Sequence, residues 1–83
     1  MKPEIADEVP WGDGLTEYDK AHLVTYLRLL DANADGASTE VMAEVVLGID
    51  PTREPQRAAK AVASHLRRAQ WMTDHGYRDL LRR

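Results

Sequence analysis

The sequence predicts an all-α protein, a compact bundle of three to four helices with a helix-turn-helix-like arrangement. Apolar residues recur at spacings of three and four in three separate segments, which is the period of an amphipathic helix. Helix-capping residues precede these segments, and glycine or proline separates them. The chain has 83 residues, 43% hydrophobic and 30% charged, a globular composition for one domain. We expect a flexible acidic tail over residues 1–14 and a helical domain over residues 15–83.

The first helix is expected over residues 17–34. Thr16 is suited to cap its start, and Asp19 stands at the position that completes a capping box. Gly36 can adopt the left-handed conformation that ends a helix. The predicted buried stripe consists of Leu23, Tyr26, Leu27, Leu30 and Ala34.

The second helix is short, with Ser38 as its cap and Gly48 as the residue that ends it. Because β-branched residues lower helix propensity, packing against the other helices has to hold this segment. Its predicted apolar face consists of Val41, Met42, Val45, Val46 and Leu47.

The third helix is expected from Glu54 or Pro55 to about Thr73, because proline is well tolerated in a first turn. Gly76 ends it, and residues 77–81 are expected to form a short helical turn that closes the core beside Trp71. The predicted buried stripe consists of Ala58 or Ala59, Val62, Leu66, Ala69 and Met72.

Composition excludes several classes of function. Without cysteine the chain has no disulfide, no thiolate nucleophile and no zinc–cysteine site. The three histidines are scattered, and no serine stands in a strand–turn–helix elbow. No apolar run approaches the roughly 18 residues of a membrane span, and the N-terminus lacks a signal-peptide core. We therefore predict a cytoplasmic protein that is not an enzyme and that uses no cofactor or metal.

Residues 31–36, Asp-Ala-Asn-Ala-Asp-Gly, match the opening of an EF-hand calcium loop. Such a loop needs a bidentate carboxylate at its twelfth position, because calcium takes about six to eight oxygen ligands. Met42 occupies that position here. We interpret the segment as a helix end followed by the cap of the next helix.

Charge is distributed unevenly along the chain, although the net charge is only −3. Residues 1–50 carry eleven acids against three bases, whereas residues 51–83 carry eight bases against three acids. A molecule polarised in this way can present an acidic surface to a basic protein and a basic surface to an anion.

The segment from Gly36 to Ile49 has the rhythm of the first helix and turn of a helix-turn-helix. Ala43 stands where a small residue permits a close helix crossing, and Gly48 stands in the turn. The following helix offers basic and polar groups to a major groove, although the turn is long and contains two prolines. Helix-turn-helix shapes also bind proteins. The candidate partner-binding residues are Glu40, Glu44, Arg57, Lys60, Ser64 and Arg68.

From residue 15 to residue 81 the chain resembles a helix-turn-helix-related domain-of-unknown-function family found on integrative and conjugative elements of rhizobia. The residues that carry the resemblance are Leu29-Leu30, Gly36-Ala37-Ser38, Val41-Met42-Ala43, Leu47-Gly48, Val62, Leu66-Arg67-Arg68 and Gly76-Tyr77-Arg78-Asp79-Leu80-Leu81. The resemblance implies an antiactivator that binds transcriptional activators of element excision and transfer. Its partners would be a LuxR-type quorum-sensing regulator and a master activator carrying domains of the same family.

Two main hypotheses follow. In the first, the acidic half covers the basic DNA-binding surface of an activator, and like charge keeps the chain off DNA. In the alternative, the chain is a helix-turn-helix DNA-binding regulator that uses Arg53, Arg57, Lys60 and Arg68. An adaptor of the toxin–antitoxin or phage type would have the same fold. The acidic first half leads us to predict protein partners ahead of DNA.

Overall fold

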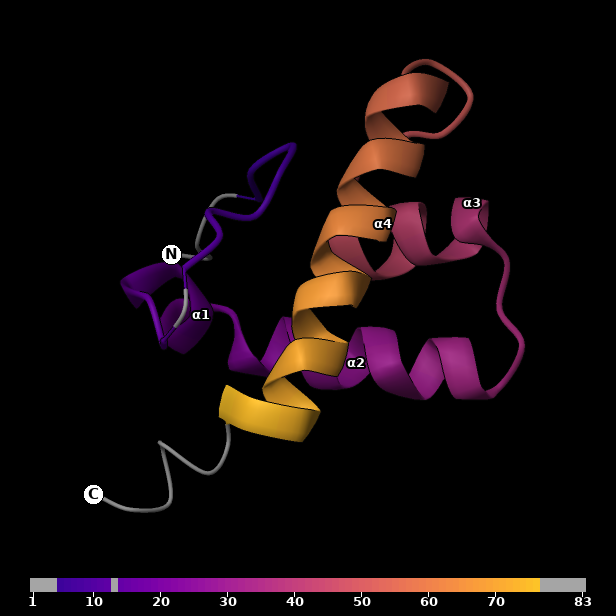
Figure 1. Cartoon of the computed structure of the whole chain (residues 1–83). Coiled ribbons are helices and arrows are strands. Elements are labelled where there is room, and N and C mark those ends of the chain that lie inside the picture. Colours follow the sequence, from indigo (N-terminus) through magenta and orange to yellow (C-terminus); the bar gives the residue numbers. More distant parts are fainter. Residues whose placement is uncertain (1–4, 13, 77–83) are drawn as a thin grey trace.

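The computed structural model describes residues 5–12 and 14–76, which contain helices and no strand (Figure 1). The elements are α1 (Glu17–Ala21), α2 (Leu23–Ala34), α3 (Thr39–Val41), η1 (Met42–Leu47), α4 (Pro55–Trp71) and η2 (Met72–Gly76). The long helix α4 crosses α2 and packs on both α2 and η1. This arrangement confirms the predicted all-α, helix-turn-helix-like fold. The terminal turn expected over residues 77–81 lies outside the described residues.

The start of the first helix is as predicted, but its continuity is not. The side-chain hydroxyl of Thr16 accepts from the Asp19 amide at 3.1 Å, and the Asp19 carboxylate accepts from the Thr16 amide at 3.0 Å. His22, with φ −118° and ψ 21°, then separates α1 from α2. Its ring nitrogen Nδ1 lies 2.8 Å from the Tyr18 carbonyl, and its amide is shared between the Tyr18 and Asp19 carbonyls. The prediction of one uninterrupted helix over residues 17–34 was therefore wrong at His22.

The second helix begins and ends where expected, with a wider turn inside it. The Ser38 hydroxyl accepts from the Val41 amide at 3.2 Å, and Gly48 ends η1 with φ +72°. Because η1 is a π-helix, residues five apart share a face, and Met42 and Leu47 are both buried. Val41 and Val45, predicted to lie on the apolar face, are instead exposed.

Gly48 supplies a left-handed backbone conformation that residues with a Cβ adopt at a cost. An added Cβ would meet no atom within 4 Å, so backbone strain alone should decide the effect of a substitution. We expect Gly48→Ala to lower the free energy of unfolding by about 1–2 kcal/mol, measured by urea titration. Gly12→Ala is the control, because its φ is not positive and the nearest contact of its added Cβ is an ordinary one, 3.4 Å from Thr16 Cγ2. Equal stability of the two variants would contradict this account.

The core forms two clusters along α4. The larger joins Leu29 of α2 to the second helix and the first half of α4, and the smaller gathers Tyr26, Ala69 and Met72. The members of the larger cluster are Leu29, Met42, Ala43, Leu47, Ile49, Ala58, Ala61 and Val62.

The break at His22 changes which residues of α2 are buried. Leu29 is fully buried, whereas Leu27 of the predicted stripe is exposed, and so is Ala34. On α4, His65 and Arg68 join the buried face, Ala59 is exposed and Leu66 is only partly buried. Among the described residues, no helix combines the length and apolar character needed to cross a membrane.

Residues 5–12, which we call the N-terminal segment, pack against α4 although the sequence predicted a tail there. Val9 is buried, and the guanidinium of Arg68 donates to the Gly12 carbonyl at 2.8 Å. The rings of Trp11 and Trp71 meet edge to face, 6.1 Å between centroids. These contacts join residues more than 50 positions apart, so a local pattern of the sequence does not identify the partners.

Candidate nucleic-acid interface

The loop before α4 positions the outward face of that helix. The Asp50 carboxylate accepts from the Thr52 amide at 2.9 Å and from the Arg53 amide at 3.3 Å. Pro55 occupies the first turn of α4, where its missing N–H is harmless. The exposed residues that follow are spaced by three or four and share one face of the helix. They are Gln56, Lys60, Ala63 and Arg67.

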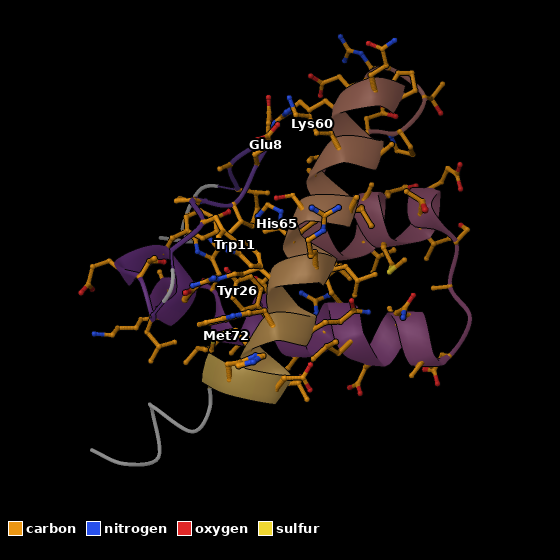
Figure 2. The ribbon with its side chains drawn as sticks, in the orientation of Figure 1. Glu8, Trp11, Tyr26, Lys60, His65 and Met72 are labelled. Atoms are coloured by element: carbon orange, nitrogen blue, oxygen red, sulfur yellow. The ribbon has the colours of Figure 1, made fainter. Side chains whose placement is uncertain are left out.

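Lys60 lies on this face and Arg57 lies half-buried at its edge, and both are already paired. Arg57 Nε lies 2.6 Å from the Asp7 carboxylate, and its Nη1 lies 3.0 Å from Glu54. Lys60 Nζ lies 2.9 Å from Glu8, and Figure 2 shows these two side chains meeting between α4 and the N-terminal segment. The hydrogen bond that Arg57 donates to Asp7 raises the pKa of Arg57, and the one that Lys60 donates to Glu8 raises the pKa of Lys60.

Ser64 lies one turn further along α4 and is also engaged. Its hydroxyl accepts from the Val9 amide at 2.8 Å. The structure therefore brings Arg57, Lys60 and Ser64 together along one line, and the N-terminal segment runs beside all three. Their candidate role as binding residues stays a prediction.

Arg53 and Arg67 form no ion pair within residues 5–12 and 14–76, and both are exposed. Arg67 was not among the predicted binding residues. A signal for it exists in the sequence, because Lys60 and Arg67 are seven residues apart and therefore lie on the same face, two turns from each other. These two arginines extend the basic face at both ends.

Arg68 does not belong to the outward face, which corrects its prediction as a partner-binding residue. Its side chain is fully buried, with Nη2 2.6 Å from the equally buried Asp19 carboxylate. The guanidinium also donates to the Gly12 and Gly14 carbonyls at 2.8 Å each. Its carbon Cζ lies 3.8 Å from the Trp71 ring centroid and 4.6 Å from that of Trp11. Arg68 therefore holds the N-terminal segment to α1 and α4 from inside.

Asp19 remains ionised inside this cluster. Burial alone would raise the pKa of its carboxyl, but hydrogen bonds from Arg68, the Thr16 amide and Tyr26 outweigh burial and lower it. The Tyr26 hydroxyl donates to Asp19 at 2.8 Å, and burial together with this carboxylate raises the pKa of Tyr26. The polar atoms of this buried cluster therefore satisfy one another.

A second buried group, His65, connects α4 to α1. Its Nδ1 lies 2.7 Å from the Ala61 carbonyl, so Nδ1 carries the proton and Nε2 accepts from the Tyr18 hydroxyl at 2.5 Å. The same hydroxyl accepts from the Ala6 amide at 3.0 Å. Burial lowers the pKa of His65, and the neighbouring His22 lowers it further, against the Ala61 hydrogen bond.

This lowered pKa predicts a loss of stability in mild acid. The unfolded chain takes up a proton on His65 below about pH 6.5, while the folded chain resists protonation to a lower pH. We expect a smaller free energy of unfolding at about pH 5.5 than at about pH 7.5, measured by urea titration. Asp19, whose pKa is lowered, contributes its stability above its ordinary value of about 4 and loses it only at lower pH.

His65→Gln should flatten this dependence, because it removes the buried imidazole. An undiminished dependence in His65→Gln would assign the effect to another group.

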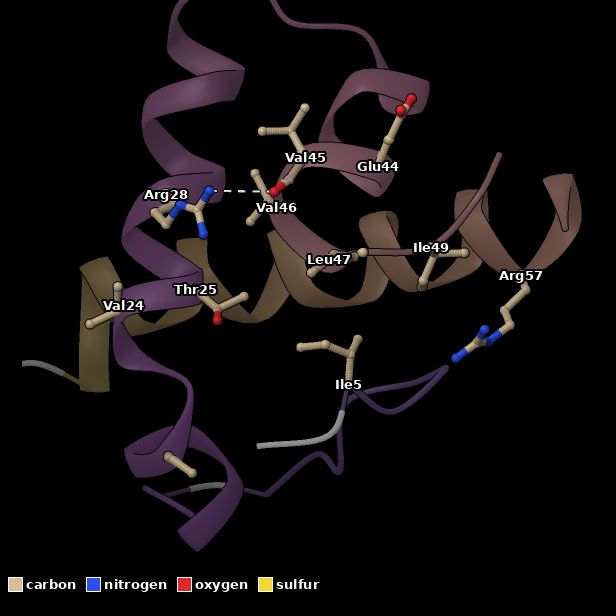
Figure 3. A pocket seen from close by; sticks show the side chains of 12 residues that line it. Ile5, Val24, Thr25, Arg28, Glu44, Val45, Val46, Leu47, Ile49 and Arg57 are labelled. Carbon is tan, nitrogen blue, oxygen red and sulfur yellow. Dashed lines mark hydrogen bonds between the residues drawn. The ribbon is translucent and has the colours of Figure 1, made fainter. Parts of the chain in front are cut away.

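The two predicted acidic residues lie outside α4. Glu40 in α3 and Glu44 in η1 are both exposed. Glu44 borders a hollow of about 990 Å³ between α2, η1 and Ile5 (Figure 3). Val24 and Val45 line this hollow, and Arg28 Nη2 donates to the Val45 carbonyl at 3.3 Å across it. Arg57 of α4 lines the same hollow as Glu44, so an acidic residue of η1 and a basic residue of α4 border one surface.

The segment that resembles a calcium loop is mostly helical. Asp31 and Asn33 lie within α2, which continues to Ala34, and Gly36 follows with φ +81°. In the described part of the chain, no three histidine or acidic side chains form a group that could hold a metal ion.

Comparison with known families matches the chain to a family of DNA-binding domains. The family model RovC_DNA-bd, described as "T6SS, Transcription factor, DNA binding domain", matches residues 4–82. No curated protein matches the sequence. The matched range includes every described element and the basic face of α4.

Proposed function

The chain belongs to the family of T6SS transcription factor DNA-binding domains, and from this membership we propose that it is a DNA-binding transcriptional regulator. The sequence raised two main hypotheses, and DNA binding was the alternative one. Membership in this family favours DNA binding over antiactivation. The observation that carries the proposal is the basic surface formed by α4 and the loop before it, which together carry four cations. They are Arg53, Arg57, Lys60 and Arg67.

The proposed mode of contact follows from the helix-turn-helix arrangement. The second helix, formed by α3 and η1, and the Gly48 turn lead into α4, which then lies in the major groove as the recognition helix. Cations along the helix contact phosphates and set its register on the duplex. Near the start of α4, Gln56 has an exposed amide of the kind that reads adenine. The role requires no catalytic group and places the protein in the cytoplasm with its DNA.

The direct test is equilibrium binding to labelled duplex DNA over a range of salt concentrations. We expect binding at low salt whose affinity falls steeply as salt rises, because each phosphate contact releases counterions. Selection from a random-sequence duplex library then identifies the preferred site. Failure to bind any duplex at low salt would overturn the proposal.

A second candidate function is antiactivation through protein contact, as implied by the resemblance to the antiactivator QseM. One observation favours it: Arg57 and Lys60 are occupied by the chain's own acids, while Glu40 and Glu44 stand exposed. Its test is co-purification with the LuxR-type and master activators encoded on the same element. Absence of a complex with either activator would contradict this candidate.

A further inference from the structure

The N-terminal segment is held against the helices by contacts that involve no acidic side chain. The Ala6 amide donates to the Tyr18 hydroxyl, and the Val9 amide donates to the Ser64 hydroxyl. Val9 is buried, and the Gly12 carbonyl accepts from Arg68. Backbone groups and apolar side chains of the segment therefore hold it against the helices beside the ion pairs of Asp7 and Glu8.

Asp7 and Glu8 lie between these anchors and contact the basic face of α4. Their carboxylates meet Arg57 at 2.6 Å and Lys60 at 2.9 Å, while their own side chains remain 57% and 64% exposed. Ion pairs this exposed contribute little to folding stability. Their evident physical effect is to neutralise two of the four cations that the proposed function assigns to DNA.

The contact between the segment and α4 is not sealed. A hollow of about 340 Å³ lies between them, with Glu8, Val9 and Trp11 on one side and residues of α4 on the other. Lys60, Ser64 and Arg67 line the α4 side. Water and anions therefore have access to the cations behind the carboxylates.

We propose that Asp7 and Glu8 are an intramolecular competitor for DNA phosphates, which shields Arg57 and Lys60 in the free protein. The inference rests on the proposed function, because it concerns the same face of α4. Carboxylate and phosphate oxygens use the same charge-assisted hydrogen bonds to arginine and lysine. Phosphates must displace the carboxylates, so weak non-specific contacts are suppressed and duplexes that make further contacts are favoured.

The experiment compares DNA affinity of the full chain with that of Asp7→Asn/Glu8→Gln, which keeps the backbone anchors and side-chain sizes. We expect the variant to bind a labelled mixed-sequence duplex about five- to thirty-fold more tightly at low salt. The gain should shrink as salt rises, because exposed charges are screened. The urea midpoint should stay close to that of the unaltered chain.

Asp31→Asn/Asp35→Asn is the matched control, because it removes two exposed acids from the end of α2 and changes the net charge equally. Its affinity should change less than that of Asp7→Asn/Glu8→Gln. Equal gains in affinity in both variants, or unchanged affinity in both, would overturn the proposal that Asp7 and Glu8 compete with phosphates. DNA binding itself would still be established. Absence of binding in all three proteins would overturn the proposed function and, with it, this inference.

Discussion

Arg68→Met is expected to destabilise the fold by about 3–5 kcal/mol, since it leaves the buried Asp19 carboxylate without its partner. The substitution also removes the donors to the Gly12 and Gly14 carbonyls and the cation between Trp11 and Trp71. A domain of this length has a total stability of only about 4–12 kcal/mol. The variant should therefore be partly or largely unfolded at room temperature, as followed by circular dichroism during urea titration.

The adjacent Arg67→Met is the matched control, because that side chain is exposed and forms no ion pair within the described residues. Its stability should lie within about 0.5 kcal/mol of the unaltered chain. The double variant Arg68→Met/Asp19→Asn should lose less than the sum of its single variants, because the uncompensated charge is gone. A loss below about 1 kcal/mol in Arg68→Met would contradict the assignment of this pair as a structural centre.

Reversing two charges on α4 should have the largest effect on DNA binding. Lys60→Glu/Arg67→Glu replaces two cations on one helical face with anions that repel the phosphates. We expect affinity for duplex DNA at low salt to fall by about a hundredfold or more, and the slope of log K against log salt to decrease by about two. The measurement is a salt series of equilibrium titrations with a labelled duplex.

Lys20→Glu/Arg28→Glu provides the control, because it makes the same change in net charge on α1 and α2 instead of on α4. Its effect should be several-fold at most. An equal loss in both double variants would show that affinity follows total charge and that α4 is not the contact surface.

Local signals in the sequence determined where the helices begin and end. Thr16 and Ser38 satisfy free amides within three residues, Pro55 is suited to a first turn, and Gly48 adopts φ +72°. Each of these effects depends on a few neighbouring residues, so the composition of a short window is sufficient to predict it. The π turn in η1 and the break at His22 escaped prediction, because both depend on how the helix packs.

Local signals in the sequence predicted only part of the candidate site. Helical spacing placed Arg57, Lys60 and Ser64 on one face of α4, and the structure agrees with that placement. What covers this face was not predictable, because Asp7 and Arg57 are 50 positions apart and exposed acids carry no pattern that selects a partner.

Arg68 is the clearest case in which the tertiary structure, and not the local sequence, decided whether a side chain is buried. Arginine on a helix is almost always at the surface unless it is paired, so the sequence predicted a solvent-facing cation. Its partner Asp19 lies 49 positions away and had already been explained locally as part of a capping box. Burial of both charges becomes favourable only when the folded chain supplies Asp19, two carbonyls and two indole rings around one guanidinium. The sequence alone therefore determined the helices and the outward face of α4, whereas folding decided which of its arginines remained free to bind a partner.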